Sequence, residues 1–170
     1  MSRGPQNKVP QKKTETAGRG ADVLQLDNQL CFAVYAAAHA FNATYKPLLE
    51  PLGLTYPQYL VMLVLWQEDD VTVSGIGARL GLDSGTLTPL LKRLEAGGFV
   101  ARLRDAADER QVRITLTASG RALKQKAKAV PQQLLCALGL SLGEIGALRG
   151  RLEALTANLR ANLGAFEAGT

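Results

Sequence analysis

Cysteine and histidine are scarce in this sequence, which has two cysteines and a single histidine among its 170 residues. Two cysteines are too few for the disulfide framework of a small secreted protein. The low cysteine content favours a reducing compartment, where a cysteine pair is more often redox-active or metal-binding. With no C-x-x-C pair and His39 as the only imidazole, one chain lacks the ligands of a structural zinc site. We therefore expect no metal ion and no cofactor.

Long hydrophobic runs are also missing. No apolar stretch reaches the roughly 18 residues that a membrane span needs, and no short apolar segment follows a basic start, so neither a span nor a signal peptide is expected. Hydrophobic residues still make up 46% of the chain, which is enough for a core. We expect a cytoplasmic protein with one domain, or with two small lobes that share helices.

The net charge of +5 is unevenly distributed along the chain. Residues 79–128 hold eleven lysines and arginines against five acidic residues, whereas residues 21–78 hold one lysine against six. A basic segment of this kind is typical of a surface that binds phosphates, although a charged face that contacts only solvent is the simpler alternative. Residues 1–20 are basic and almost free of large apolar side chains, which predicts a disordered tail.

The first half of the chain is predicted to be helical. Apolar residues recur at steps of three and four over residues 26–45, so one face of a long helix is apolar, with its N-cap at residue 27 or 28. Pro47 should end or bend this helix. Thr55 is expected to cap a second, almost wholly apolar helix over residues 55–66.

Two short helices are predicted next, over residues 72–82 and 84–98, with a tight turn between them. This is the helix-turn-helix arrangement, in which the second helix enters the major groove of DNA by its N-terminal residues. A helical pair in a bundle would give a similar pattern. Pro89 should delay the regular helix to Gly85 or Thr86, or distort its first turn. The residues expected to face bases or phosphates are Ser84, Thr86, Thr88, Lys92 and Arg93.

Residues 99–117 alternate between apolar and polar on both sides of a charged turn, which predicts a β-hairpin. A helix-turn-helix followed at once by a basic hairpin is a winged helix, and Arg110 at the hairpin tip has the length and charge to enter a minor groove. Asp105 or Asp108 is expected to hold this arginine or the wing backbone. The alternative is a solvated turn with surface ion pairs. The fold class is thus mainly α with a small β wing, and residues 55–117 are assigned to the DNA-binding region.

The remainder is predicted to be helical again. Thr117 or Ser119 should cap a segment that runs to Leu138, with a kink at Pro131. Ser141 should cap the last helix.

The last helix carries a heptad seam, which needs another helix to cover it. A two-fold dimer would supply that helix and would match paired half-sites in DNA. An intrachain partner, such as the helix of residues 27–45, is the alternative for part of the seam. Residues 21–54 and 118–170 are accordingly assigned to a dimerisation lobe. The seam consists of Ile145, Leu148, Leu152, Leu155 and Leu159.

Four segments together resemble a known family. They are LDNQLCFAVY (26–35), YKPLLEPLGLTYPQYLVMLVLW (45–66), LDSGTLTPLLKRLEAGGFV (82–100) and DAADERQVRITLT (105–117). With this set the chain resembles the MarR family of dimeric winged-helix repressors, and within it the OhrR branch, which senses organic hydroperoxides. The resemblance runs from about residue 24 to residue 138. The tail and the last helix resemble the family only in their general type of structure and not in their residues.

The resemblance implies that Cys31 is the peroxide-sensing thiol. Family members hydrogen-bond this sulfur through tyrosine hydroxyls, and the matching positions are Tyr45 and Tyr56, with Tyr35 on the side from which the partner subunit approaches. The residues agree, because a thiolate is the reactive form and is stabilised near a helix N-terminus and by hydrogen-bond donors. Without the resemblance, an inert core cysteine would be the favoured interpretation of Cys31.

Cys136 resembles the resolving cysteine of the two-cysteine members, although it could also be a spectator thiol. The implied function is a redox-sensing transcriptional repressor that binds double-stranded operator DNA as a reduced homodimer. It releases the DNA when an organic hydroperoxide oxidises Cys31 and a disulfide forms with the partner subunit's Cys136.

Two other functions stay open. A MarR-type repressor that responds to a non-covalent phenolic or acidic ligand would use Cys31 only to line a pocket. A thiol peroxidase would also oxidise a lone cysteine, but a basic winged helix has no purpose in such an enzyme. No set of catalytic residues can be assembled from the sequence, so we expect a protein that is not an enzyme.

Overall fold

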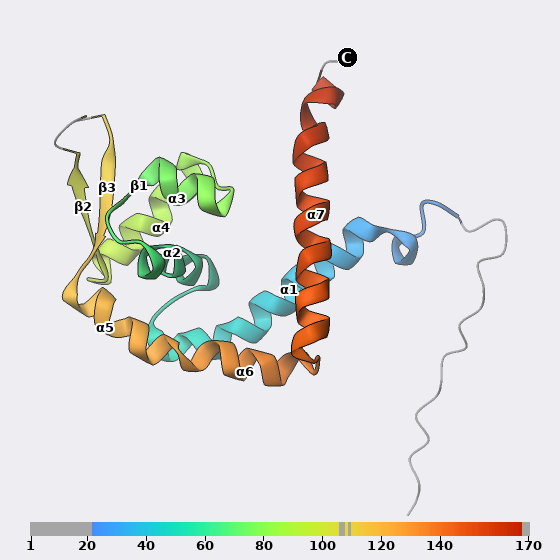
Figure 1. Cartoon of the computed structure of the whole chain (residues 1–170), viewed down its shortest axis with the longest axis horizontal. Helices are drawn as coiled ribbons and strands as arrows, with labels where there is room; N and C mark the ends of the chain where they lie inside the picture. Colours follow the sequence, from blue (N-terminus) through green and yellow to red (C-terminus); the bar gives the residue numbers. More distant parts are fainter. Residues whose placement is uncertain (1–21, 106–107, 109, 168–170) are drawn as a thin grey trace, which may run out of the picture. The chain divides into compact units, whose positions relative to one another are not determined.

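The computed structural model describes residues 22–105, 108 and 110–167, and for residues 164–167 the backbone only. The predicted tail and part of the wing tip lie outside these residues. The described chain is mainly α-helical with one small three-stranded sheet, as predicted (Figure 1). Contacts divide the chain within its first long helix, into the units Met1–Ala40 and Phe41–Thr170.

The first long helix begins later than predicted. A 3-10 turn, η1 (Leu26–Asn28), precedes α1 (Leu30–Leu49), so residues 27 and 28 belong to the turn and do not cap the helix. The Asn28 side-chain amide instead donates to the carbonyl oxygen of Asp22 at 3.2 Å, a local bond that competes with capping. Cys31 is therefore the second residue of α1.

Pro47 does not end α1, which continues to Leu49 and passes directly into η2 (Glu50–Leu52). The proline removes a single backbone donor close to the C-terminal end of the helix, where the loss is small. α2 (Tyr56–Gln67) then begins at the predicted cap, Thr55. The Thr55 N–H donates to the Gln58 side-chain oxygen at 2.8 Å, as in a capping box.

α3 (Val73–Leu80) and α4 (Ser84–Ala96) form the predicted helix-turn-helix. The turn between them is tight. A Cβ on Gly77 would lie 2.7 Å from the Leu82 carbonyl oxygen, and Gly81 adopts a left-handed conformation with φ 67°. Glycine is needed at position 77 because there is no room for a Cβ, and at position 81 because it adopts positive φ without strain.

α4 starts one or two residues earlier than predicted. Asp83 is its N-cap, with Oδ1 accepting from the Thr86 N–H at 2.8 Å. Pro89 consequently lies inside the helix. Its missing N–H removes the helical donor of the Gly85 carbonyl, but the cap and the buried leucines of α4 hold the first turn in place.

β2 (Val100–Arg104) and β3 (Val112–Leu116) form the predicted hairpin. A third strand, β1 (Val71–Thr72), pairs antiparallel with the other edge of β3, so the strand order is β1-β3-β2. β1 was not predicted, because two residues are too few to show an alternating pattern. Since α3 follows β1 directly, this strand connects the helix-turn-helix to the wing.

The N-caps predicted for the helices in the C-terminal part of the chain are confirmed. The Thr117 hydroxyl accepts from the N–H three residues on at 3.0 Å and begins α5 (Ala118–Ala127). Ser141 precedes α7 (Leu142–Glu167) and forms a full capping box. The Ser141 N–H donates to Glu144 Oε2 at 2.9 Å, and the Ser141 hydroxyl accepts from the Glu144 N–H at 3.3 Å.

The predicted kink at Pro131 is wrong by one turn. The helix breaks at Lys128, between α5 and α6 (Ala129–Leu138), and Pro131 lies in the first turn of α6. A proline ring clashes with the helical carbonyl four residues before it, which here belongs to Ala127, the last residue of α5. The break therefore precedes the proline, whose missing N–H is harmless in a first turn.

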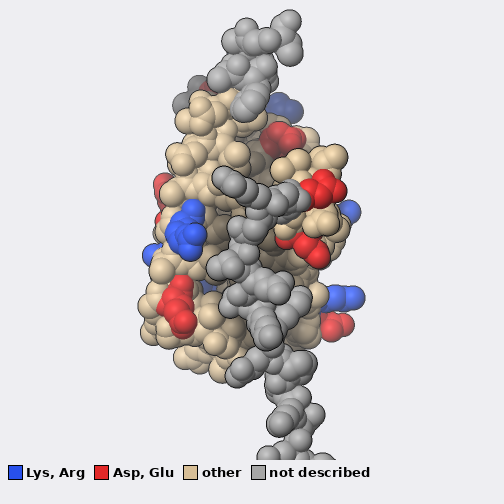
Figure 2. Space-filling model, turned by 90° about the vertical axis from the view of Figure 1, so that its right-hand side faces the viewer, with Lys and Arg blue, Asp and Glu red and all other residues tan. Residues whose placement is uncertain are grey.

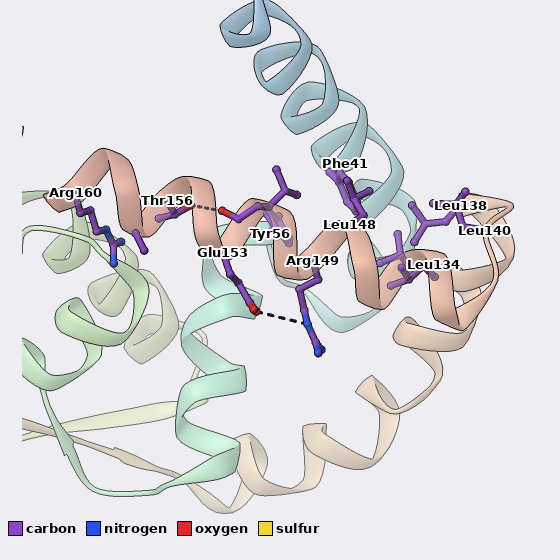
Figure 3. Close-up of a pocket in the computed structure, with 13 residues that line it drawn as sticks. Phe41, Tyr56, Leu134, Leu138, Leu140, Leu148, Arg149, Glu153, Thr156 and Arg160 are labelled. Carbon is purple, nitrogen blue, oxygen red and sulfur yellow. Dashed lines mark hydrogen bonds and ion pairs between the residues drawn. The ribbon is translucent and has the colours of Figure 1, made fainter. Parts of the chain in front are cut away.

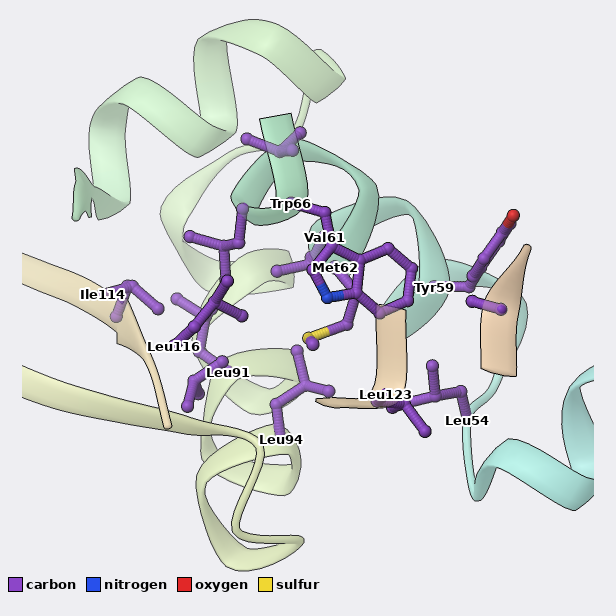
Figure 4. Packing of buried hydrophobic residues seen from close by; sticks show 14 of the residues in the cluster. Leu54, Tyr59, Val61, Met62, Trp66, Leu91, Leu94, Ile114, Leu116 and Leu123 are labelled. Atoms are coloured by element: carbon purple, nitrogen blue, oxygen red, sulfur yellow. The ribbon is translucent and has the colours of Figure 1, made fainter. Parts of the chain in front are cut away.

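The hydrophobic core of the second unit packs α2 against α4, β3 and α5. Figure 4 shows Met62 and Trp66 of α2 near Leu91 and Leu94 of α4. Burying side chains of this size stabilises the fold by about 1.5–3 kcal/mol each. The core thereby fixes how α4 is rotated about its axis. The fully buried residues of this core include Met62, Ile76, Leu87, Leu91, Leu94 and Ile114.

In the part of the chain that the structure describes, no single helix has both the length and the apolar composition to cross a membrane. Residues 30–52 and α2 meet both criteria only when taken together as a bent pair.

Candidate nucleic-acid interface and thiol site

The core determines which face of α4 is free. Leu87, Leu91 and Leu94 are completely buried, so the opposite face of the helix points outward. The predicted DNA-contacting residues lie on this outward side and in the first turn. Ser84, Thr86, Lys92 and Arg93 are exposed, and Thr88 is half-buried.

Two threonine hydroxyls of α4 are already used as donors. Thr86 donates through its hydroxyl to Asp83 Oδ2 at 2.9 Å, and Thr88 donates to the Ser84 carbonyl at 2.6 Å. Hydrogen bonds from the Thr86 N–H and then from its hydroxyl hold the pKa of Asp83 below its usual value. Toward a ligand, both threonines therefore present a methyl group and acceptor lone pairs, which suit contacts to base edges.

The wing tip is organised by Asp108. Its Oδ1 accepts from the Arg110 N–H at 3.0 Å, and its Oδ2 accepts from the Gln111 side chain at 3.1 Å. Asp108 thus holds the wing backbone, which is one of the two predicted roles. The Arg110 side chain is exposed.

Asp105, the other predicted acid, pairs with Arg113, which was not among the predicted site residues. Arg113 Nη1 donates to Asp105 Oδ2 at 3.2 Å, and Arg113 Nε donates to Asp70 Oδ1 at 2.7 Å. Hydrogen bonds to Asp70 and then to Asp105 raise the pKa of Arg113. Asp70 itself adopts φ 60°, which is unusual for a residue other than glycine.

Asp69 makes a second group of contacts next to this one. Its Oδ1 accepts from the Leu116 N–H at 2.8 Å, and its Oδ2 accepts from Arg121 at 2.9 Å. Partial burial opposes ionisation, but the bonds from Leu116, Asp70 and Arg121 together hold the pKa of Asp69 below its usual value. In the sequence, Asp69 and Asp70 are visible as two adjacent acids ahead of a basic hairpin. Their partners could not be predicted because they lie more than 40 residues away.

Aromatic side chains of α1 and α2 form a row inside the second unit. The rings of Tyr45 and Tyr56 stack with centroids 4.4 Å apart, and Tyr59 lies 5.8 Å from Tyr45 and 6.1 Å from Trp66. Burial, followed by the neighbouring phenols, raises the pKa of Tyr45 to about 12. At physiological pH the Tyr45 hydroxyl is protonated, as an ordinary phenol also is, and can donate a hydrogen bond. The structure thus brings together two of the three predicted thiolate-stabilising tyrosines.

Cys31 is exposed in the described chain and not packed in the core. As the second residue of α1 it lies at the positive end of the helix dipole. The third predicted tyrosine, Tyr35, follows one turn later, and its ring contacts that of His39 with centroids 4.3 Å apart. Cys136, near the end of α6, is also a free and exposed thiol.

A cavity of about 720 Å³ lies between α2, α6 and α7 in the second unit (Figure 3). Tyr56 and Phe41 line it together with leucines of α6 and α7. An ion pair between Arg149 and Glu153, 3.5 Å apart, lies at its edge. Part of the predicted heptad seam therefore faces side chains of the same chain.

Much of the seam is nevertheless uncovered in a single chain. Leu148 and Leu152, which line the cavity, are still 47% and 45% exposed, and Leu159 beyond it is 62% exposed. Figure 2 shows lysine and arginine side chains interspersed with aspartate and glutamate on the visible face of the molecule. Among the described residues, no three side chains of histidine, cysteine, aspartate or glutamate gather as metal ligands would.

Comparison with known proteins identifies the family. The family model of the transcriptional regulators SarA/Rot matches residues 43–127. The organic hydroperoxide resistance transcriptional regulator of Bacillus subtilis is 50% identical over 114 residues, which cover 67% of this chain and 78% of that protein. The chain belongs to the MarR family of winged-helix transcriptional regulators.

Other transcriptional regulators match over more of the chain. The transcriptional regulator TtmR of Methylorubrum extorquens is 52% identical over 159 residues, covering 94% of this chain and 82% of TtmR. The structure of reduced AbfR bound to DNA superposes with a TM-score of 0.70 at 41% identity, covering 80% of this chain and 93% of that one. AbfR is from Staphylococcus epidermidis. Its disulfide form superposes with a TM-score of 0.56 at 42% identity, covering 77% and 92%.

Proposed function

We propose that this protein is a repressor that binds operator DNA as a reduced homodimer and releases it when an organic hydroperoxide oxidises Cys31. The observation that carries the proposal is an exposed thiol in the first turn of α1, in a chain that also has a complete winged helix. A regulator of this kind needs both parts, because one part reads DNA and the other reacts.

The winged helix supplies the DNA contacts. The first turn of α4 enters the major groove, where Ser84, Thr86 and Thr88 contact base edges and Lys92 and Arg93 contact phosphates. Arg110 enters the adjacent minor groove from the wing. The excess of basic residues over residues 79–128 supports this arrangement, as does the solved complex of AbfR with DNA.

The dimer is formed by residues 21–54 and 118–170, and residues 55–117 bind DNA. Exposed leucines along α7 support this division, because a heptad seam is stable only against another helix. Two subunits related by a two-fold axis would also match two DNA half-sites.

The thiolate site is completed by the partner subunit. Fourteen residues separate Cys31 from Tyr45, and fourteen residues of α-helix rise about 21 Å, which side chains of one chain do not bridge. We therefore assign the hydrogen bonds on Cys31 to the partner subunit's Tyr45 and the partner subunit's Tyr56. Their stacking supports this role, because it holds two phenol groups, which are hydrogen-bond donors, side by side.

The chemistry has two steps. The Cys31 thiolate attacks the terminal oxygen of the hydroperoxide, the O–O bond breaks, and the alkoxide leaves and takes up a proton as the alcohol. The resulting sulfenic acid then condenses with the thiol of the partner subunit's Cys136, which forms the S–S bond and releases water.

Disulfide formation would respace the two winged helices. The Cα atoms of a disulfide lie within about 7 Å, so helices that hold the two thiols farther apart must move. Each loss of about 1.4 kcal/mol in binding energy weakens the affinity tenfold. A small rotation of the two reading helices is therefore enough for release.

The test is a mobility shift with the full-length reduced protein and a labelled duplex from the region upstream of its own coding sequence. Cumene hydroperoxide should release the wild type, whereas Cys31→Ser should bind equally well and stay bound. Cys136→Ser should be oxidised without forming an intersubunit disulfide on a non-reducing gel. Retention of wild type on the DNA after oxidation contradicts the proposal, and release of both proteins by a phenolic ligand selects the ligand-responsive alternative.

A further inference from the structure

One side chain ties the three strands of the sheet together at the base of the wing. Arg113, on the central strand β3, bonds Asp70 Oδ1 at 2.7 Å through Nε and Asp105 Oδ2 at 3.2 Å through Nη1. Its third nitrogen donates to the Asp70 carbonyl oxygen. Asp70 directly precedes β1 and Asp105 directly follows β2, so a single guanidinium bridges both edge strands. We call these three residues the clasp.

The strand register explains why the members of the clasp meet. Arg113 lies opposite Leu103 on β2 and opposite Thr72 on β1. Asp105 and Asp70 lie just beyond the strands, two residues from those partners, and their bonds to Arg113 bring all three side chains together on one face of the sheet. The other face of β3 packs on the core. The clasp can therefore act on the wing without being part of the core.

Asp105 connects the clasp to the wing tip. Its Oδ2 accepts from Arg113, whereas its Oδ1 accepts from the Asp108 N–H at 3.3 Å. Asp108 in turn accepts from the Arg110 N–H at 3.0 Å. Two carboxylates in series thus link the backbone that carries Arg110 to the Arg113 guanidinium.

We propose that Arg113 is a positioning residue for DNA binding, which holds the wing in the orientation from which Arg110 enters the minor groove. Three of the five N–H groups of Arg113 already donate within the clasp, so we assign it a positioning role and not a contact with DNA. Asp70 and Asp105 place negative charge on the lobe that approaches phosphates, which by itself weakens binding. This role rests on the proposed DNA-binding function but on none of its redox steps.

A double-mutant cycle tests the role. The affinities of full-length reduced wild type, Arg110→Ala, Arg113→Leu and the double variant are measured by fluorescence anisotropy on the upstream duplex. We expect each single variant to bind roughly tenfold more weakly, the loss that follows from about 1.4 kcal/mol. The double variant should be no more than about twofold weaker than Arg110→Ala, because interacting sites are not additive. Additive losses overturn the proposal.

The sign of a charge change gives a second, independent test. Asp105→Asn removes a negative charge, so electrostatics alone predicts tighter DNA binding, whereas loss of the clasp predicts weaker binding. Glu68→Gln is the matched control, since Glu68 pairs with Arg79 at 3.3 Å on the exposed surface of the same unit. We expect weaker binding for Asp105→Asn and unchanged or slightly tighter binding for Glu68→Gln. Tighter binding of Asp105→Asn overturns the proposal.

The Arg113→Lys variant distinguishes the effect of the guanidinium geometry from the effect of its positive charge, and it is less disruptive to the fold than Arg113→Leu. Lysine keeps the charge but does not bridge two carboxylates in a planar fork, so DNA binding should fall as in Arg113→Leu. Urea unfolding of each variant reports whether the fold is intact. An Arg113→Lys variant that binds like wild type overturns the proposal. Failure of wild type to bind any upstream duplex would instead contradict the proposed function.

Discussion

At the scale of single residues, the fourteen-residue spacing between Cys31 and Tyr45 decides how the thiol site is built. Residue types could be read from the sequence, because a cysteine near a helix start and tyrosines in the matching positions are visible there. The sequence did not reveal that burial raises the pKa of Tyr45, since this depends on how the rings of Tyr56 and Tyr59 pack around it. The burial of a side chain depends on tertiary packing and cannot be read directly from the amino-acid sequence.

Tyr45 should make the folded protein sensitive to high pH. Its pKa rises from 10.0 in the unfolded chain to about 12 in the folded one, so the folded state holds the proton more tightly. This contribution to stability is fully present below pH 10 and is lost as the pH rises toward 12. Tyr45→Phe should therefore flatten the alkaline decline in the free energy of unfolding. Urea titrations across this range check the slope, and below about pH 9 the two proteins should show the same pH dependence.

At the scale of elements, local signals were reliable and long-range contacts were not. Thr55, Thr117 and Ser141 cap the helices that the sequence assigned to them, because capping involves residues only three positions apart. The partners of Asp69 escaped detection because they lie more than 40 residues away, and β1 escaped it because two residues show no alternation. The break at Lys128 was misplaced because a proline acts on the turn that precedes it.

Gly120 tests how closely α5 packs on the sheet. A Cβ at this position would lie 2.0 Å from the Phe99 carbonyl oxygen, a contact that only a shift of the whole first turn relieves. Gly120→Ala should therefore lower the free energy of unfolding by about 3 kcal/mol or more, as overpacking in a core does. The matched control is Gly146→Ala in α7, where the new methyl group meets nothing within 4 Å.

The control should gain about 0.5–1 kcal/mol, since alanine favours a helix interior over glycine. Urea unfolding followed by circular dichroism measures both variants. Equal effects of the two substitutions would contradict the packing described for α5.

At the scale of the whole molecule, the exposed seam of α7 is the feature that a single chain leaves unsatisfied. The heptad spacing was visible in the sequence. How far the chain covers its own seam was not, because the cavity beside α7 depends on side chains from α2 and α6. Leucines at the far end of the seam stay exposed, and the proposed dimer accounts for them.

Leu159→Glu should separate the subunits without unfolding them. The side chain is 62% exposed in the single chain, so its replacement removes little burial there, but a carboxylate in a helix seam would be desolvated against the partner. We expect a monomer by light scattering and a loss of DNA affinity of about 100-fold or more, because one half-site then binds alone. Ala161→Glu, on the opposite side of α7, is the control and should remain dimeric. A dimeric Leu159→Glu would place the interface elsewhere.

The row of aromatic rings gives the molecule a built-in optical probe. Trp66 is the only tryptophan of the chain and lies at the end of this row, where its indole N–H donates to the Gly120 carbonyl at 2.9 Å. Light absorbed by a phenol passes to a nearby indole, so tryptophan emission under tyrosine excitation depends on how closely Tyr59 and Tyr45 approach it. Rearrangement around the tyrosines can thus be followed in real time as a change in colour and yield, without attaching a dye.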